Sequence, residues 1–112
     1  GDQANMNTIH KINARISIVK IWFEKFLLKN SDYDILLSTL NAQEKYYRRN
    51  SAITQQKKEA YVNFILATKL LLDSVLDKDQ PVEKRKLIDK YLSGQVAIVS
   101  KNWLMEKYSA IG

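Results

Sequence analysis

Residues 60–76 read AYVNFILATKLLLDSVL, and their apolar side chains form the clearest helical pattern in the chain. Tyr61, Phe64, Thr68, Leu71 and Val75 follow one another by three or four residues, which places them on one face of an α-helix. Further apolar residues widen that face: Ile65, Leu72 and Leu76. The pattern predicts a helix over residues 54–77, after a break at Asn50-Ser51, that packs against more than one neighbour.

Two more helices are predicted before it. Over residues 8–29, after an N-cap at Asn7 or Thr8, the apolar side chains recur at helical spacing: Ile9, Ile12, Ile16, Val19, Phe23 and Phe26. Ser31 and Asp34 have the spacing of a capping box, which predicts a second helix over residues 32–49. Its inner stripe consists of Leu36, Leu40, Gln43 and Tyr47. Because the connection is short, the two helices should be antiparallel neighbours.

A fourth helix is predicted over residues 81–108. Pro81 suits a first helical position, and Glu83 complements the helix dipole. The inner stripe continues as Ile88, Tyr91, Gln95, Ile98, Asn102 and Met105. Gly94 weakens this helix by about 1 kcal/mol relative to Ala, so a kink or a division into two shorter helices is possible there.

These four segments predict one all-α domain over residues 1–112, an antiparallel up-down four-helix bundle. In such a bundle both termini lie at one end together with the turn at residues 50–54. The other two turns, at residues 29–32 and 77–81, lie at the opposite end. The 46% hydrophobic and 27% charged residues suit a packed helical domain.

The composition excludes several kinds of chemistry. The chain has no Cys, which excludes disulfides and thiol catalysis, and its one His is His10. It has no His-x-x-x-His or Glu-x-x-His pair, no glycine-rich phosphate loop and no Gly-x-Ser-x-Gly motif. We therefore expect no catalytic residues, no metal site, no cofactor and no enzymatic activity. No apolar run reaches the roughly 18 residues of a membrane span, and residues 1–6 do not resemble a signal peptide.

Basic residues give the chain a net charge of +6 and form two groups. The first group is Lys45, Arg48, Arg49, Lys57 and Lys58, and the second is Lys84, Arg85, Lys86 and Lys90. In the predicted bundle they lie at opposite ends, whereas a nucleic-acid-binding protein needs a continuous basic surface. Nucleic acid is therefore an unfavourable partner. The first group lies at the end that holds both termini, where an anionic bilayer would attract it by about 1 kcal/mol per charge.

Trp22 lies away from the inner stripe of the first helix, on a second stripe with Lys11, Arg15 and Ile18. A second apolar stripe requires a second neighbour. That neighbour is either another helix of the same bundle, or a symmetry mate in a dimer with a ligand crevice in which Arg15 binds an anion.

The sequence from Lys20 to Lys25, KIWFEK, resembles the first helix of bacterial extracytoplasmic sensor domains, in which Trp, an aromatic residue and an acidic residue occur in this register. Lys20 and Lys25 stand where such a helix has His and Glu. Those domains are four-helix bundles of chemoreceptors, sensor histidine kinases and diguanylate cyclases. The resemblance covers residues 7–40.

It implies a periplasmic or extracellular ligand-sensing module of a membrane receptor, with one transmembrane helix before Gly1 and one after Gly112. Such a module would act as a homodimer and pass small helix shifts to the membrane. Under this interpretation the candidate contacts to a small anionic ligand are Arg15, Trp22, Tyr61, Arg85 and Tyr91. The alternative is a small cytoplasmic interaction protein that resembles a bacteriocin immunity protein in length and helical content, with Met6 as its first residue.

Overall fold

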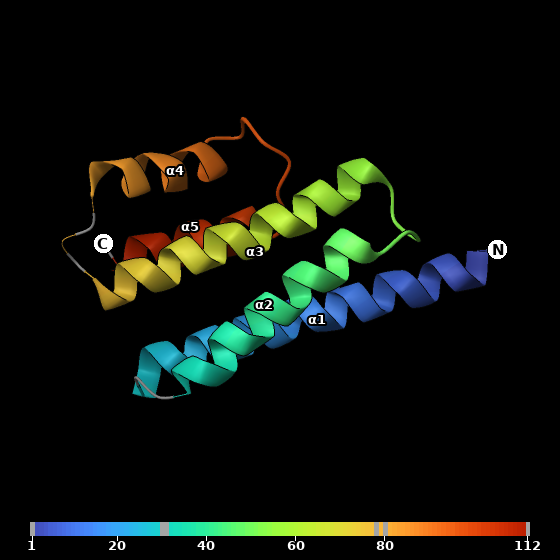
Figure 1. Cartoon of the computed structure of the whole chain (residues 1–112), viewed down its shortest axis with the longest axis horizontal. Coiled ribbons are helices and arrows are strands. Elements are labelled where there is room, and N and C mark those ends of the chain that lie inside the picture. The colour runs from blue at the N-terminus through green and yellow to red at the C-terminus, as the bar shows by residue number, and fades with distance from the viewer. Residues whose placement is uncertain (1, 30–31, 78, 80, 112) are drawn as a thin grey trace. The chain divides into compact units, whose positions relative to one another are not determined.

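The computed structural model describes residues 2–29, 32–77, 79 and 81–111, and their side chains from residue 6 onward. These residues form five α-helices and no strand, so the all-α prediction is confirmed. The helices are α1 (Asp2–Lys29), α2 (Tyr33–Arg49), α3 (Gln55–Leu76), α4 (Val82–Leu92) and α5 (Lys101–Ile111) (Figure 1). They belong to two compact units, one with α1 and α2 and one with α3, α4 and α5.

The first unit is an antiparallel helical hairpin held together by the predicted stripes. On α1 the buried side chains are Ile12, Ile16, Val19, Phe23 and Phe26, and on α2 they are Leu36, Leu40, Gln43 and Tyr47. The ring of Phe26 also lies 6.1 Å from that of Tyr33, near the turn between the two helices. Spacings of three and four residues place these side chains on facing stripes, which explains why this pair of helices associates.

The beginning of α1 differs from the prediction. The helix starts at Asp2 rather than after an N-cap at Asn7 or Thr8, and Ile9 is 45% exposed instead of buried. Asn and Thr can cap a helix, but they cost only a few tenths of a kcal/mol inside one. Asn7 and Thr8 therefore do not prevent the helix from beginning earlier. The predicted capping box depends on Ser31, which lies outside the described residues. The N-cap of α2 is Asp32, in a left-handed conformation with φ 66° and without a side-chain cap hydrogen bond.

In the second unit, α3 packs against both α4 and α5, as its wide apolar face predicted. Its N-cap is Thr54, whose Oγ1 accepts a hydrogen bond of 3.3 Å from the backbone N–H of Lys57. The buried apolar side chains of α3 are Val62, Phe64, Ile65, Ala67, Leu71 and Leu72. α4 contributes the buried Ile88, and α5 contributes the buried Leu104.

The predicted helix over residues 81–108 is wrong as a single element. α4 ends at Leu92, and residues 93–100 cross to α3 before α5 begins at Lys101. Gly94 has φ +88°, a left-handed conformation that glycine adopts without steric cost. After it, the β-branched residues 96, 98 and 99 favour an extended chain over a helix.

Two hydrogen bonds fasten this connecting segment to α3. The Asn63 side chain donates to the carbonyl of Ala97 at 2.8 Å, and the N–H of Val99 donates to the carbonyl of Ala60 at 3.4 Å. The glycine therefore does more than kink one helix, because the chain reverses its direction between α4 and α5.

The reversal makes α5 parallel to α3. Val99 lies beside Ala60, and the Trp103 ring lies 5.9 Å from the Phe64 ring. The two helices therefore run in the same direction. The C-terminal end of α5 consequently lies at the end of the unit where α3 finishes, away from Gln55 (Figure 1). This order places the end of α5 away from the start of α3, unlike the prediction for the C-terminus, and the up-down order of four helices is not confirmed, because the described residues form five helices.

Candidate functional site

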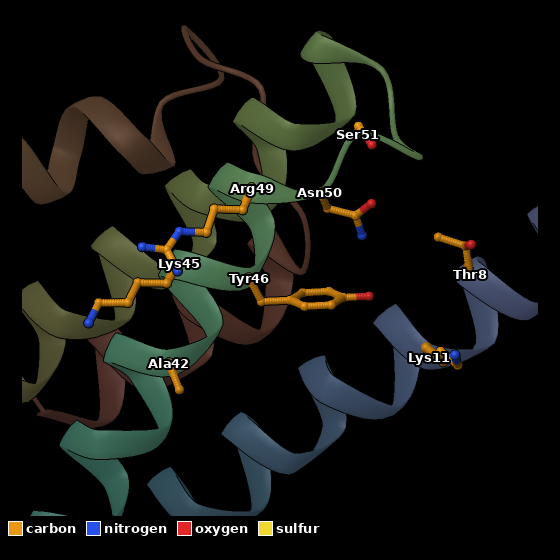
Figure 2. Close-up of a pocket in the computed structure, with 8 residues that line it drawn as sticks. All are labelled: Thr8, Lys11, Ala42, Lys45, Tyr46, Arg49, Asn50 and Ser51. Carbon is orange, nitrogen blue, oxygen red and sulfur yellow. The ribbon is translucent and has the colours of Figure 1, made fainter.

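A shallow basic groove lies on the first unit, where the start of α1 meets the end of α2 (Figure 2). It has a volume of about 550 Å³. Its lining residues come from both helices and from the chain just after α2: Thr8, Lys11, Ala42, Lys45, Tyr46, Arg49, Asn50 and Ser51. We refer to it as the basic groove.

The described charged side chains that line the basic groove are all positive. Three of its residues, Lys11, Lys45 and Arg49, are cationic, and its described lining residues include no carboxylate. Within the part of the chain that the structure describes, none of the three forms an ion pair, whereas the neighbouring Arg48 binds Glu44 at 2.9 Å. Uncompensated cations at a partly enclosed surface produce a positive potential that attracts anions.

Tyr46 forms the centre of the groove. Its ring extends from α2 toward Thr8 and Lys11 of α1 (Figure 2), and the guanidinium carbon of Arg15 lies 3.7 Å from the ring centroid. The ring also meets that of Tyr47 edge to face at 5.4 Å. These contacts fix the ring, and its hydroxyl has no hydrogen-bond partner among the described residues. The Tyr46 hydroxyl is thus available to a bound molecule.

Beneath the groove, a short chain of hydrogen bonds joins the two helices. The Gln43 amide donates to the backbone carbonyl of Arg15 at 2.8 Å, and the Tyr47 hydroxyl donates to the Gln43 side-chain oxygen at 3.0 Å. Gln43 is only 4% exposed and Tyr47 is fully buried. Because buried polar groups require partners, this chain fixes the axial register of α1 against α2, and with it the shape of the groove.

The cations border the groove without converging on one point. In Figure 2 the Lys45 and Arg49 side chains extend from α2 on the side opposite to the Tyr46 ring. A pocket for one small anion would instead direct several donors at one position. This arrangement favours a ligand that makes contacts along the surface.

The five predicted site residues occupy different places. Arg15 and Trp22 lie on α1, Tyr61 lies on α3, and Arg85 and Tyr91 lie on α4. None of them lines the basic groove, but Arg15 contacts a lining residue, Tyr46. Arg85 is exposed, and the three aromatic residues are half-buried.

Tyr46 was missed as a candidate. The sequence contains the adjacent pair Tyr46-Tyr47, and only one member of such a pair can face the partner helix. The other is left at the edge of the helix, beside the basic residues at positions 45, 48 and 49. That juxtaposition is the signal that sequence reasoning could have used.

Among the described residues, no cluster of three or more His, Asp or Glu could hold a metal ion. None of the helices, over the same residues, is long and apolar enough to cross a membrane. No model of a known protein family matches the chain, and comparisons with curated proteins and with solved structures find no significant match.

Proposed function

We propose that this chain is a non-catalytic binding module that recognises an anionic partner at the basic groove of the α1–α2 hairpin. Three cations border the groove without an ion-pair partner among the described residues, and its described lining holds no carboxylate; this observation carries the proposal. The Tyr46 ring is fixed, and its hydroxyl, which has no partner among the described residues, adds a polar contact that can orient the bound group.

The biological setting that we propose is ligand sensing outside the cytoplasm, as part of a bacterial membrane receptor. The resemblance of Lys20–Lys25 to the first helix of sensor domains supports this setting. The basic groove supports it as well, because its residues come from two helices whose relative shift would change the site.

A sensing mechanism would follow from the register of the hairpin. An anion that contacts Lys11 on α1 and Arg49 on α2 favours the axial register that brings the two side chains to it. The hydrogen bonds of Gln43 hold the register of the free chain, and the proposed anion-bound register differs from it. Binding would then shift α1 along α2 and move the segment that precedes α1.

We also propose that the module forms a homodimer through α1. Ile21 is 52% exposed and Leu28 is 85% exposed, on the side of α1 away from its buried stripe. A symmetry mate would cover them. Sedimentation at several concentrations tests this: Ile21→Asn should shift the distribution toward monomer, and a concentration-independent monomer of the unaltered chain would refute it.

The alternative setting is a cytoplasmic interaction protein of the bacteriocin immunity type. It uses the same groove to bind an anionic protein surface and needs no membrane anchor. The parent gene separates the two settings. The sensor requires a run of about 20 apolar residues on each side of this segment, and a gene without such runs would favour the interaction protein.

The groove itself is tested by titration with polyphosphate, followed by calorimetry at two salt concentrations. Lys11→Ala and Arg49→Ala should each weaken binding several-fold and reduce its salt dependence. Lys86→Ala removes an exposed cation from α4 and serves as the matched control. Equal losses in all three variants would refute a defined site, because they would report net charge alone.

A further inference from the structure

The basic groove continues along the hairpin as a longer face with two different ends. On α1, Lys11, Arg15, Ile18 and Trp22 follow one another by four, three and four residues, so they share one stripe of the helix. Lys11 lines the groove, and Arg15 does not line it but stacks on the lining residue Tyr46. The same stripe therefore leads from the groove to Ile18 and Trp22.

A matching stripe runs along α2. Its members are spaced by four and three residues in the same way: Ile35, Thr39, Ala42, Tyr46 and Arg49. Ala42, Tyr46 and Arg49 line the basic groove, so Ile35 lies farther along the same side of the hairpin. Because the helices are antiparallel, Lys11 and Arg49 share one end of this face, while Trp22 and Ile35 share the other.

The second end is apolar and accessible. Ile18 and Ile35 are each 44% exposed, and Trp22 is half-buried beneath the Lys25 ammonium, which lies 4.9 Å from the ring centroid. We call the whole surface, from Lys11 and Arg49 to Trp22 and Ile35, the graded face. Along both stripes the residues change from basic to apolar between these ends, and Lys25 borders the apolar end above Trp22.

The dimensions of the graded face exclude a small anion as its complete ligand. Lys11 and Trp22 are eleven residues apart, which is about 16 Å along a helix. A single phosphate or carboxylate group covers only the basic end and leaves Ile18 and Ile35 in water. A partner that covers the face needs negative charge at one end and apolar side chains at the other.

We infer that the graded face binds an amphipathic α-helix of another protein, with its acidic turns on Lys11 and Arg49 and its apolar side chains on Ile18, Trp22 and Ile35. This inference rests on the proposed anion binding at the basic groove and names its partner. A helix fits because α1 and α2 already bond their own backbone groups and offer no edge to an extended strand. Laid along the hairpin, it completes a three-helix arrangement.

The test uses the full chain with Trp103→Phe, which leaves Trp22 as the only tryptophan. The probe is a synthetic helical peptide of 15 residues, with Glu in its first two turns and Leu along one face. A second peptide of equal charge has Ser in place of each Leu. We expect the Leu peptide to shift the Trp22 emission to shorter wavelength and to bind at least tenfold more tightly than the Ser peptide.

Two Ile→Asn variants test whether the peptide binds to the graded face or elsewhere on α1. Ile18→Asn should weaken binding of the Leu peptide at least tenfold and leave polyphosphate binding unchanged. Ile9→Asn alters a residue of the same exposure outside this stripe and should leave both unchanged. Circular dichroism of each variant confirms that the hairpin remains helical.

The other possible outcomes would each overturn the inference, in different ways. Equal binding of the two peptides, or no effect of Ile18→Asn, overturns the helix-binding inference, while anion binding stands if polyphosphate still depends on Lys11 and Arg49. Failure of both the peptide and polyphosphate to bind refutes the inference and the proposed function together. Binding of phosphatidylglycerol vesicles that depends on Ile18, without binding of the Leu peptide, assigns the face to a membrane and overturns the inference.

Discussion

Removing the Tyr47 hydroxyl should measure how much the buried hydrogen bonds stabilise the α1–α2 hairpin. The hydroxyl donates to the Gln43 side-chain oxygen at 3.0 Å inside the core of the first unit. Tyr47→Phe keeps the ring and its packing but leaves that oxygen without its donor. The loss of one neutral hydrogen bond and the desolvation of the remaining acceptor predict a fall of about 1–2 kcal/mol in the free energy of unfolding.

A double-mutant cycle with Gln43→Met sharpens the prediction. Met has nearly the volume of Gln and makes no hydrogen bond, so this change alone deprives the Tyr47 hydroxyl of an acceptor, at about 1–3 kcal/mol. In the double variant, both members of the Gln43–Tyr47 hydrogen bond are replaced by apolar side chains, so neither leaves the other without a partner. The double variant should therefore lose less than the sum of the single losses, by about 1 kcal/mol.

The assay follows urea unfolding by fluorescence in the Trp103→Phe background, in which Trp22 reports on the first unit alone. Tyr46→Phe is the control, since the Tyr46 hydroxyl has no described partner, and it should change stability by less than about 0.5 kcal/mol. Strictly additive losses in the cycle would refute the reasoning. A loss from Tyr46→Phe as large as that from Tyr47→Phe would refute it as well.

Three further changes test other parts of the fold, each by urea unfolding. Gly94→Ala should destabilise the second unit by about 1–2 kcal/mol, because a Cβ disfavours the positive φ; an unchanged midpoint would contradict this. Asn63→Ala removes the bond to the Ala97 carbonyl and should cost about 0.5–1.5 kcal/mol, with faster hydrogen exchange confined to residues 95–100. Thr54→Ala removes the cap on the Lys57 N–H and should cost about 1 kcal/mol, while Thr54→Ser should be nearly neutral.

Sequence periodicity was enough to predict the helices that pack along their whole length. The stripe from Ile12 to Phe26 and the stripe from Leu36 to Tyr47 are buried as expected, because side chains at spacings of three and four residues must share one face. The break after Leu92 was harder to predict. Residues 88, 91, 95 and 98 keep a helical spacing, and only the left-handed glycine and the β-branched residues after it oppose a helix.

The candidate site was predicted less well than the fold. Charge identified the basic residues around Arg49, and the second stripe of α1 identified Arg15 and Trp22. The position of Tyr46 depends on how the two helices are rotated about their axes, which the spacing of apolar residues sets only approximately. The contact between Arg15 and Tyr46 therefore emerged only from the three-dimensional arrangement.

The parallel order of α3 and α5 determines how the second unit would respond to mechanical tension. Gln55 and the end of α5 lie at opposite ends of that unit, so a pull between them slides one helix lengthwise past the other. Such shear loads all the contacts between α3 and α5 at once. In the hairpin, α1 begins where α2 finishes, and a pull on those two points separates the helices one turn after another, like a zipper. When the chain is stretched by its ends, the hairpin should yield first.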